Sequence, residues 1–164
     1  MFKFRSAILL ALAATGISNV MAADVFLQTR STDKTMPDNT TVKMWVFEQC
    51  TDNSFTSCQP GEAPGQRIDA VAGEALNFHV KNNLNVPVSL IVPGQLTNAD
   101  GSSTSIIDAK ARSRVRSMTV EVAKDATAVY TIASPRAGTY IYQSGTAPSL
   151  QVPMGLYGTL VVNS

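Results

Sequence analysis

Short stretches of alternating apolar and polar residues, separated by turn residues, run through most of the sequence. TVKMWVFEQC alternates around Val42, Met44 and Val46, and LNFHV places Phe78 and Val80 on one face. Such alternation is typical of strands that bury one face. Roughly seven or eight of these stretches follow at about ten-residue spacing, and no convincing helical pattern interrupts them. The sequence therefore predicts an all-β sandwich or barrel of Greek-key type.

Two polar segments interrupt this pattern. LTNADGSSTSIIDAKA is expected to be a surface loop, and a helical turn within SSTSIIDAKARS stays open as an alternative. The early STDKTMPDNTT is expected to belong to a polar lead-in or loop. A chain of 164 residues has room for one domain. We therefore predict a lead-in over residues 23–41 and one domain over residues 42–164.

The first 22 residues are predicted to be a secretory signal peptide. Lys3 and Arg5 precede an apolar run over residues 8–14, and small residues close the segment at Ala22 and Ala23. This order is typical of a signal peptide. The apolar run is too short to span a membrane, and no later stretch reaches that length. We expect an exported protein, periplasmic or secreted, without a transmembrane segment.

Charge argues against nucleic acid as a partner. Loss of Lys3 and Arg5 with the signal peptide reduces the 13 basic residues by two, against 12 acidic ones, so the formal charge becomes −1. One basic cluster alternates along a predicted strand and is expected to form a solvated face or to protect a sheet edge, rather than to bind an anion. Its members are Lys110, Arg112, Arg114 and Arg116.

The only two cysteines, Cys50 and Cys58, close the polar segment CTDNSFTSC. In an oxidising compartment, two cysteines this close in sequence predict a disulfide that pins a hairpin. A metal-binding or redox role is the lesser alternative, because the CxxC spacing is absent and the chain has a single histidine.

Three longer segments resemble the first cupredoxin (plastocyanin-like) domain of multicopper oxidases. They are PGQRIDAVAGEALNFHVKNNLNVPVSL, VRSMTVEVAKDATAVYTIASPRAGTYIY and MGLYGTLVV. The resemblance covers roughly residues 42–162, and its most specific blocks are AGTYIYQSG and GLYGTLVV, with VKNNL upstream. It implies a two-sheet sandwich of cupredoxin type. The resemblance also implies a type of domain that, in active oxidases, supplies half of the histidines of a trinuclear copper cluster.

The resemblance also implies where those histidines would stand. In the family, one H-x-H pair stands where this chain has Ser89–Gly94 (SLIVPG). The other stands where this chain has Gln143, Ser144 and Gly145. Every matching position is substituted, so Gln143 and Gly145 are degenerate ligand positions. We therefore expect no catalytic residues and no bound cofactor, with copper as the alternative that the family implies.

An inventory of metal-binding side chains leads to the same expectation without the family. A blue-copper centre needs a thiolate and two imidazoles, and His79 is the only histidine. Because His79 alternates with Phe78 and Val80, we expect it on the outer face of its strand, as a surface or hydrogen-bonded structural residue. The weak metal candidates are His79 and Met154. Of the mature methionines, Met44, Met118 and Met154 are expected to fill the core, and Met36 lies in a predicted loop.

The sequence thus predicts an exported, stand-alone domain that is not an enzyme by itself. Its expected role is a non-catalytic binding or assembly module that docks onto a separate multicopper oxidase chain or another exported protein. The alternative is a copper-binding protein or a subunit of a split multicopper oxidase. A third hypothesis is a purely structural β-sandwich.

Overall fold

The computed structural model describes residues 22–97, 104–107 and 110–164, with the backbone alone for residues 104–107. Residues 1–21 of the predicted signal peptide lie outside this range. Within the described ranges, no helix is both long enough and apolar enough to cross a membrane.

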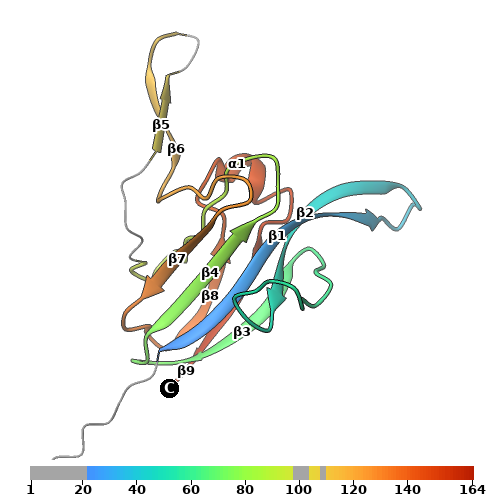
Figure 1. The fold of residues 1–164 in the computed structure, drawn as a ribbon. Coiled ribbons are helices and arrows are strands. Elements are labelled where there is room, and N and C mark those ends of the chain that lie inside the picture. Colours follow the sequence, from blue (N-terminus) through green and yellow to red (C-terminus); the bar gives the residue numbers. More distant parts are fainter. Residues whose placement is uncertain (1–21, 98–103, 108–109) are drawn as a thin grey trace, which may run out of the picture.

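Two sheets face each other in the body of the molecule (Figure 1). The larger has the order β2-β1-β4-β7, formed by Ala23–Thr35 (β1), Thr41–Cys50 (β2), Leu76–Asn82 (β4) and Thr127–Ile132 (β7). The smaller has the order β3-β9-β8, formed by Gly65–Val71 (β3), Gly138–Gln143 (β8) and Tyr157–Asn163 (β9). The pairs β1–β4 and β3–β9 are parallel, and the other pairs are antiparallel. A short helix, Pro148–Gln151 (α1), precedes β9. The predicted all-β sandwich is confirmed.

The core forms between the sheets because alternate residues of each strand point inward. In β4, Phe78 is fully buried, and in β9 so is Leu160. The ring of Tyr142 from β8 lies 5.8 Å from that of Phe47 in β2 and 6.1 Å from that of Phe78, centroid to centroid. These three aromatic rings join the two sheets.

The expected lead-in over residues 23–41 was wrong, because Ala23–Thr35 forms β1 between β2 and β4. Val25, Leu27 and Thr29 are buried against the sandwich. Beyond Thr29, β1 pairs with β2 alone, and this two-stranded ribbon extends past the rest of the sheet (Figure 1). The ribbon has little core to cover, so its residues are mostly polar. A polar sequence is typical of a loop, and this is why a loop was predicted.

The segment LTNADGSSTSIIDAKA was expected to be a loop or to contain a helical turn. Its part that the structure describes as regular is a strand instead. Thr104–Ile107 (β5) and Ser113–Ser117 (β6) form an antiparallel hairpin that projects from the body (Figure 1). The residues between them at positions 108 and 109, and the stretch 98–103, lie outside the described residues. β-branched residues, which favour extended backbone, explain the strands within a polar context. They are Thr104, Ile106, Ile107 and Val115.

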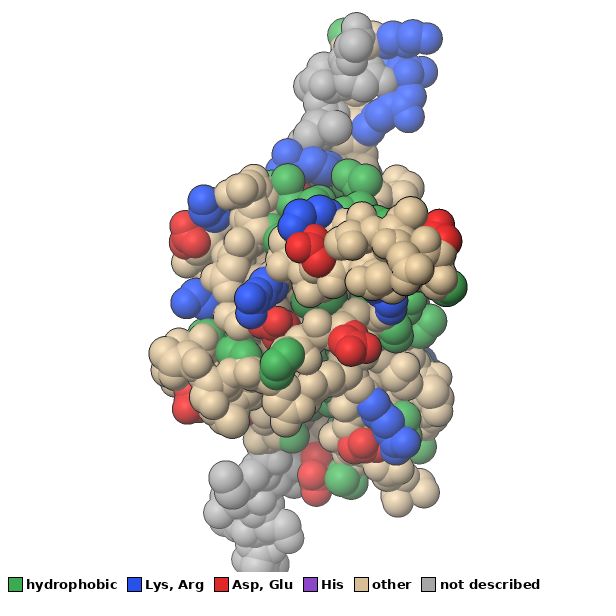
Figure 2. Space-filling view, turned by 90° about the vertical axis from the view of Figure 1, so that its right-hand side faces the viewer, with side chains coloured by type: hydrophobic (Ala, Val, Ile, Leu, Met, Phe, Trp, Pro, Cys, Tyr) green, Lys and Arg blue, Asp and Glu red, His purple; other side chains and the backbone are tan. Residues whose placement is uncertain are grey.

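The basic cluster lies along this hairpin, where Figure 2 shows Lys and Arg side chains gathered on the projecting part. Arg112 and Arg114 are exposed, as expected for a solvated face. Arg116 lies nearer the body and forms a bidentate ion pair with Glu121. The hydrogen bonds to that carboxylate raise the pKa of Arg116.

The predicted disulfide between Cys50 and Cys58 is confirmed. It closes the loop that follows β2. Backbone hydrogen bonds flank it, from Thr51 N to Ser57 O at 3.0 Å and from Gln59 N to Gln49 O at 2.9 Å. The loop is therefore a pinned hairpin that continues the edge of β2.

The Tyr142 ring occupies the space above Gly158, its cross-strand partner in β9. Its hydroxyl donates to the backbone carbonyl of Gln66 at 2.7 Å, and burial raises the pKa of the phenol. A Cβ atom on Gly158 would overlap the ring, and one on Gly65 would lie 2.8 Å from the hydroxyl. Glycine at these two positions is thus a packing requirement of the buried tyrosine.

Gly158→Ala should therefore destabilise the fold by about 1–3 kcal/mol, the usual cost of forcing an extra methyl group into a packed core. Urea unfolding measures this loss. Thr159→Ala is the matched control in the same strand, because it adds no atom, and it should cost less. An unchanged unfolding midpoint for Gly158→Ala would show that the ring leaves room for a side chain.

Candidate functional site

The two segments predicted to stand in place of the H-x-H pairs, Ser89–Gly94 and Gln143–Gly145, lie side by side. The backbone of Ile91 pairs with that of Gln143 through two hydrogen bonds, both of 2.9 Å. On the other side, Ser144 N donates to Leu156 O at 3.0 Å. The main chain is therefore fixed where these two segments meet, and Gln143 is half-buried there.

Gly145 lies against this junction, where an added side chain would crowd its neighbours. A Cβ atom there would approach Cγ2 of Ile91 to 2.9 Å and Oγ of Ser89 to 3.0 Å. The carbonyl of Gly145 accepts a hydrogen bond of 3.0 Å from Met118 N. A third segment, around residues 116–119, thus joins the other two at the site.

Three buried hydroxyl groups, one from each segment, form a cluster at this place. The Thr146 hydroxyl lies 3.0 Å from the hydroxyl oxygens of both Ser89 and Ser117, which are 3.1 Å apart. The Ser117 hydroxyl also lies 2.7 Å from the carbonyl of Thr119. When Ser117 donates its only proton to that carbonyl, the three contacts among the hydroxyls share the two protons of Ser89 and Thr146. We call Ser89, Ser117 and Thr146 the hydroxyl cluster.

A second buried polar pair lies beside the hydroxyl cluster. Ser144 donates to Oε1 of Gln151 at 2.6 Å, and Nε2 of Gln151 donates to the carbonyl of Pro87 at 2.8 Å. Gln151 belongs to α1, so the short helix closes this end of the sandwich. In the part of the chain that the structure describes, no buried side-chain nitrogen or oxygen lacks a hydrogen-bond partner. The site is thus lined by neutral groups whose hydrogen bonds are made within the protein.

Sequence reasoning missed the hydroxyl cluster and Gln151. Serine and threonine are common in turns and on surfaces, so nothing local marks Ser117 or Thr146 as buried. The one available signal was the polar Ser89 inside the apolar run VPVSLIV. Long-range packing, rather than spacing, brings these side chains together.

His79 lies away from this site, on the outer face of the larger sheet, as its alternation with Phe78 predicted. Its Nε2 atom donates to Oδ1 of Asp24 at 2.8 Å, and its ring stacks on Phe26 with centroids 4.7 Å apart. The hydrogen bond from His79 lowers the pKa of the Asp24 carboxyl. His79 is therefore held by contacts between β4 and β1.

The four mature methionines lie in different surroundings. Met118 was expected in the core, but 59% of it is exposed, because it follows β6 at the surface beside Ile91. Met44 and Met154 are half-buried and so only partly fill the core. Met36 and Met44 line one hollow, whereas Met154 meets β2 through its carbonyl, which accepts from Trp45 N at 2.8 Å. The described residues contain no group of three or more His, Cys, Asp or Glu side chains that could hold a metal ion.

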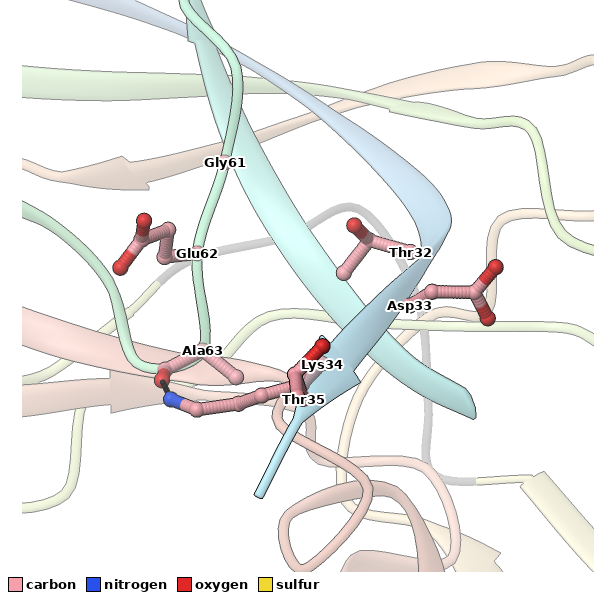
Figure 3. A pocket seen from close by; sticks show the side chains of 7 residues that line it. All are labelled: Thr32, Asp33, Lys34, Thr35, Gly61, Glu62 and Ala63. Carbon is pink, nitrogen blue, oxygen red and sulfur yellow. Dashed lines mark hydrogen bonds between the residues drawn. The ribbon is translucent and has the colours of Figure 1, made fainter. Parts of the chain in front are cut away.

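A polar hollow of about 250 Å³ lies between the end of β1 and residues 61–63 (Figure 3). Its two acidic side chains, Asp33 and Glu62, point away from each other (Figure 3). Asp33 instead forms an ion pair of 2.6 Å with Lys43. The carboxylates therefore do not form the converging pair that acid–base chemistry or cation binding requires.

Solved structures similar to this chain include several copper proteins. A multi-copper oxidase from Pseudomonas thermotolerans superposes with a TM-score of 0.65 at 19% identity, over 87% of this chain and 30% of that one. A blue copper oxidase from Nitrosomonas europaea gives 0.63 at 16%, over 87% and 39% of the two chains. A copper nitrite reductase from the same organism gives 0.60 at 18%, over 87% and 42%. The chain thus spans less than half the length of each. No curated protein matches it.

These structural likenesses confirm the predicted fold class, an all-β Greek-key sandwich of cupredoxin type. The family likeness has a separate basis, because the sequence profile described as multicopper oxidase matches residues 39–164. That range includes β2 to β9 and both of the segments that meet at Ile91 and Gln143. The chain belongs to the multicopper oxidase family.

Proposed function

We propose that this chain is an exported, copper-free binding and assembly module of the multicopper oxidase family. Its partner is a separate chain that carries further cupredoxin domains. The observation that carries the proposal is the hydroxyl cluster, which occupies the junction of the two segments that the resemblance aligns with the family's histidine pairs. Export is part of the same proposal and rests on the signal-like sequence of residues 1–22.

The chemistry of the junction supports the copper-free part of the proposal. Copper in such centres is held by imidazole and thiolate, whereas neutral hydroxyl groups are poor ligands for it. The hydroxyls of the cluster already bond to one another and to the carbonyl of Thr119. A larger side chain at Gly145 would crowd Ile91 and Ser89, and the single histidine is engaged by Asp24 in another part of the fold.

An exposed apolar surface beside the junction supports the assembly part. A hollow of about 350 Å³ is lined by Ile91, Pro93, Leu96 and Met118, among others. Leu96 is 86% exposed and Met118 is 59% exposed. Apolar side chains gathered beside a concave surface are typical of protein contact sites. We call these four residues the docking surface.

The size of the similar structures indicates what the docking surface would meet. This chain spans 30% of the length of the multi-copper oxidase and 39% of the length of the blue copper oxidase. A partner that supplies comparable domains would complete such an assembly. The competing function is a copper-binding protein or a copper-binding subunit of a split oxidase. The copper titration below distinguishes it from the copper-free module.

Titration with Cu(I) and Cu(II) should leave the purified protein without a blue absorption band and with an unchanged melting temperature. A ligand present at 100 times its dissociation constant stabilises a protein by about 2.7 kcal/mol, so micromolar binding would be visible as a higher melting temperature. His79→Gln is the control that identifies weak binding to the lone imidazole. Binding of micromolar strength or tighter that persists in His79→Gln would contradict the copper-free proposal.

Affinity purification of the tagged protein from the exported fraction should recover a chain with later cupredoxin domains, identified by mass spectrometry. Leu96→Asp and Met118→Asp should each lower the recovery about tenfold, because a buried charge is unfavourable in an apolar interface. Val71→Asp, at an exposed position of β3 outside the docking surface, is the matched control and should not change it. Recovery that is unchanged in both docking variants would contradict the proposed surface.

A further inference from the structure

An apolar hollow of about 500 Å³ lies beside the outer end of the β1–β2 ribbon, separate from the docking surface. Its volume is within the range of sites that bind small molecules. Three segments distant in sequence line it: the ribbon, the loop after the disulfide and the loop after α1. The apolar lining is Met36, Val42, Met44, Val152, Pro153 and Tyr157.

The wall formed by the loop after α1 is built by close backbone packing on β2. Trp45 N donates to Met154 O at 2.8 Å. Gly155 has a φ of 114°, and a Cβ atom there would overlap the carbonyl of Trp45 and lie 2.8 Å from Cβ of Ala63. Only glycine fits this backbone conformation and this approach. The hollow is therefore bounded by main chain that is fixed in place.

The mouth of the hollow leaves apolar groups in contact with water. Met36 is 40% exposed and Val42 is 41% exposed. Removal of this surface from water by a ligand would be favourable. Thioether groups such as those of Met36 and Met44 make favourable contacts with aromatic rings, and their flexibility lets them adapt to a flat ligand.

Two polar groups at the hollow indicate which ligand it would take. Nζ of Lys34 donates to the carbonyl of Ala63 at 2.6 Å (Figure 3), which uses one of its three N–H bonds. It forms no ion pair with any residue that the structure describes. The hydroxyl of Tyr157 likewise has no hydrogen bond to a described side chain or carbonyl. A cation and a phenol beside an apolar hollow favour an aromatic anion, whose charged group would lie at the cation and whose ring would lie in the hollow.

We propose that this hollow binds a compact aromatic carboxylate, with its ring between the methionines and its carboxylate at Lys34. This inference does not rest on the assembly function, because it uses none of the docking-surface residues. A cation would be repelled by the ammonium group of Lys34.

Naphthalene-2-carboxylate is the probe, titrated into the whole protein by isothermal calorimetry. We expect saturable binding of one ligand with a dissociation constant below about 1 mM. Met36→Asp should weaken it about tenfold, and Lys34→Gln about fivefold. Lys34→Gln should leave binding of the neutral 2-naphthol unchanged. Val71→Asp is the control at a distant exposed position and should bind the carboxylate as the wild type does.

Methyl NMR of the wild-type protein locates the site without any variant. Addition of the probe should shift the methyl resonances of Met36 and Met44 and leave that of Met118 in place. Absence of saturable binding would overturn the inference. So would binding that shifts Met118 instead, or an affinity that neither Met36→Asp nor Lys34→Gln lowers although both variants melt like the wild type.

Discussion

The packing of the Tyr142 ring on Gly158 fixes the end of β8, and the candidate site depends on that position. The ring lies between the two sheets, and its hydroxyl is tied to the carbonyl of Gln66. The next residue, Gln143, is therefore placed where its backbone meets Ile91. The block GTYIYQSG thus has a packing role that is independent of any metal ligand.

At the junction that this packing creates, the side chains make a closed set of hydrogen bonds. Ser89, Ser117 and Thr146 bond to one another, and Ser144 bonds to Gln151. Each buried group satisfied within the protein avoids the cost of lost hydration. A sandwich of cupredoxin type can therefore remain stable with hydroxyl groups at this place.

The sequence predicted those features that depend on local pattern. Alternation indicated the sandwich and the outward position of His79, and close spacing indicated the disulfide of Cys50 and Cys58. Features set by distant partners were mistaken or missed. The ribbon half of β1 is polar because it has no core to cover. Met118 is exposed because it points away from the body between the buried residues Ser117 and Thr119. Thr146 is buried only because Ser89 and Ser117 arrive from elsewhere in the chain.

The copper-free junction is the central claim, and anomalous diffraction at the copper absorption edge tests it most directly. Crystals grown with an excess of Cu(II) would be measured, and the anomalous map would be inspected between Ile91 and Gln143. The claim predicts no anomalous peak beside the hydroxyl cluster, whatever weak peaks occur at His79. A well-occupied copper peak among Ser89, Gln143 and Thr146 would contradict it.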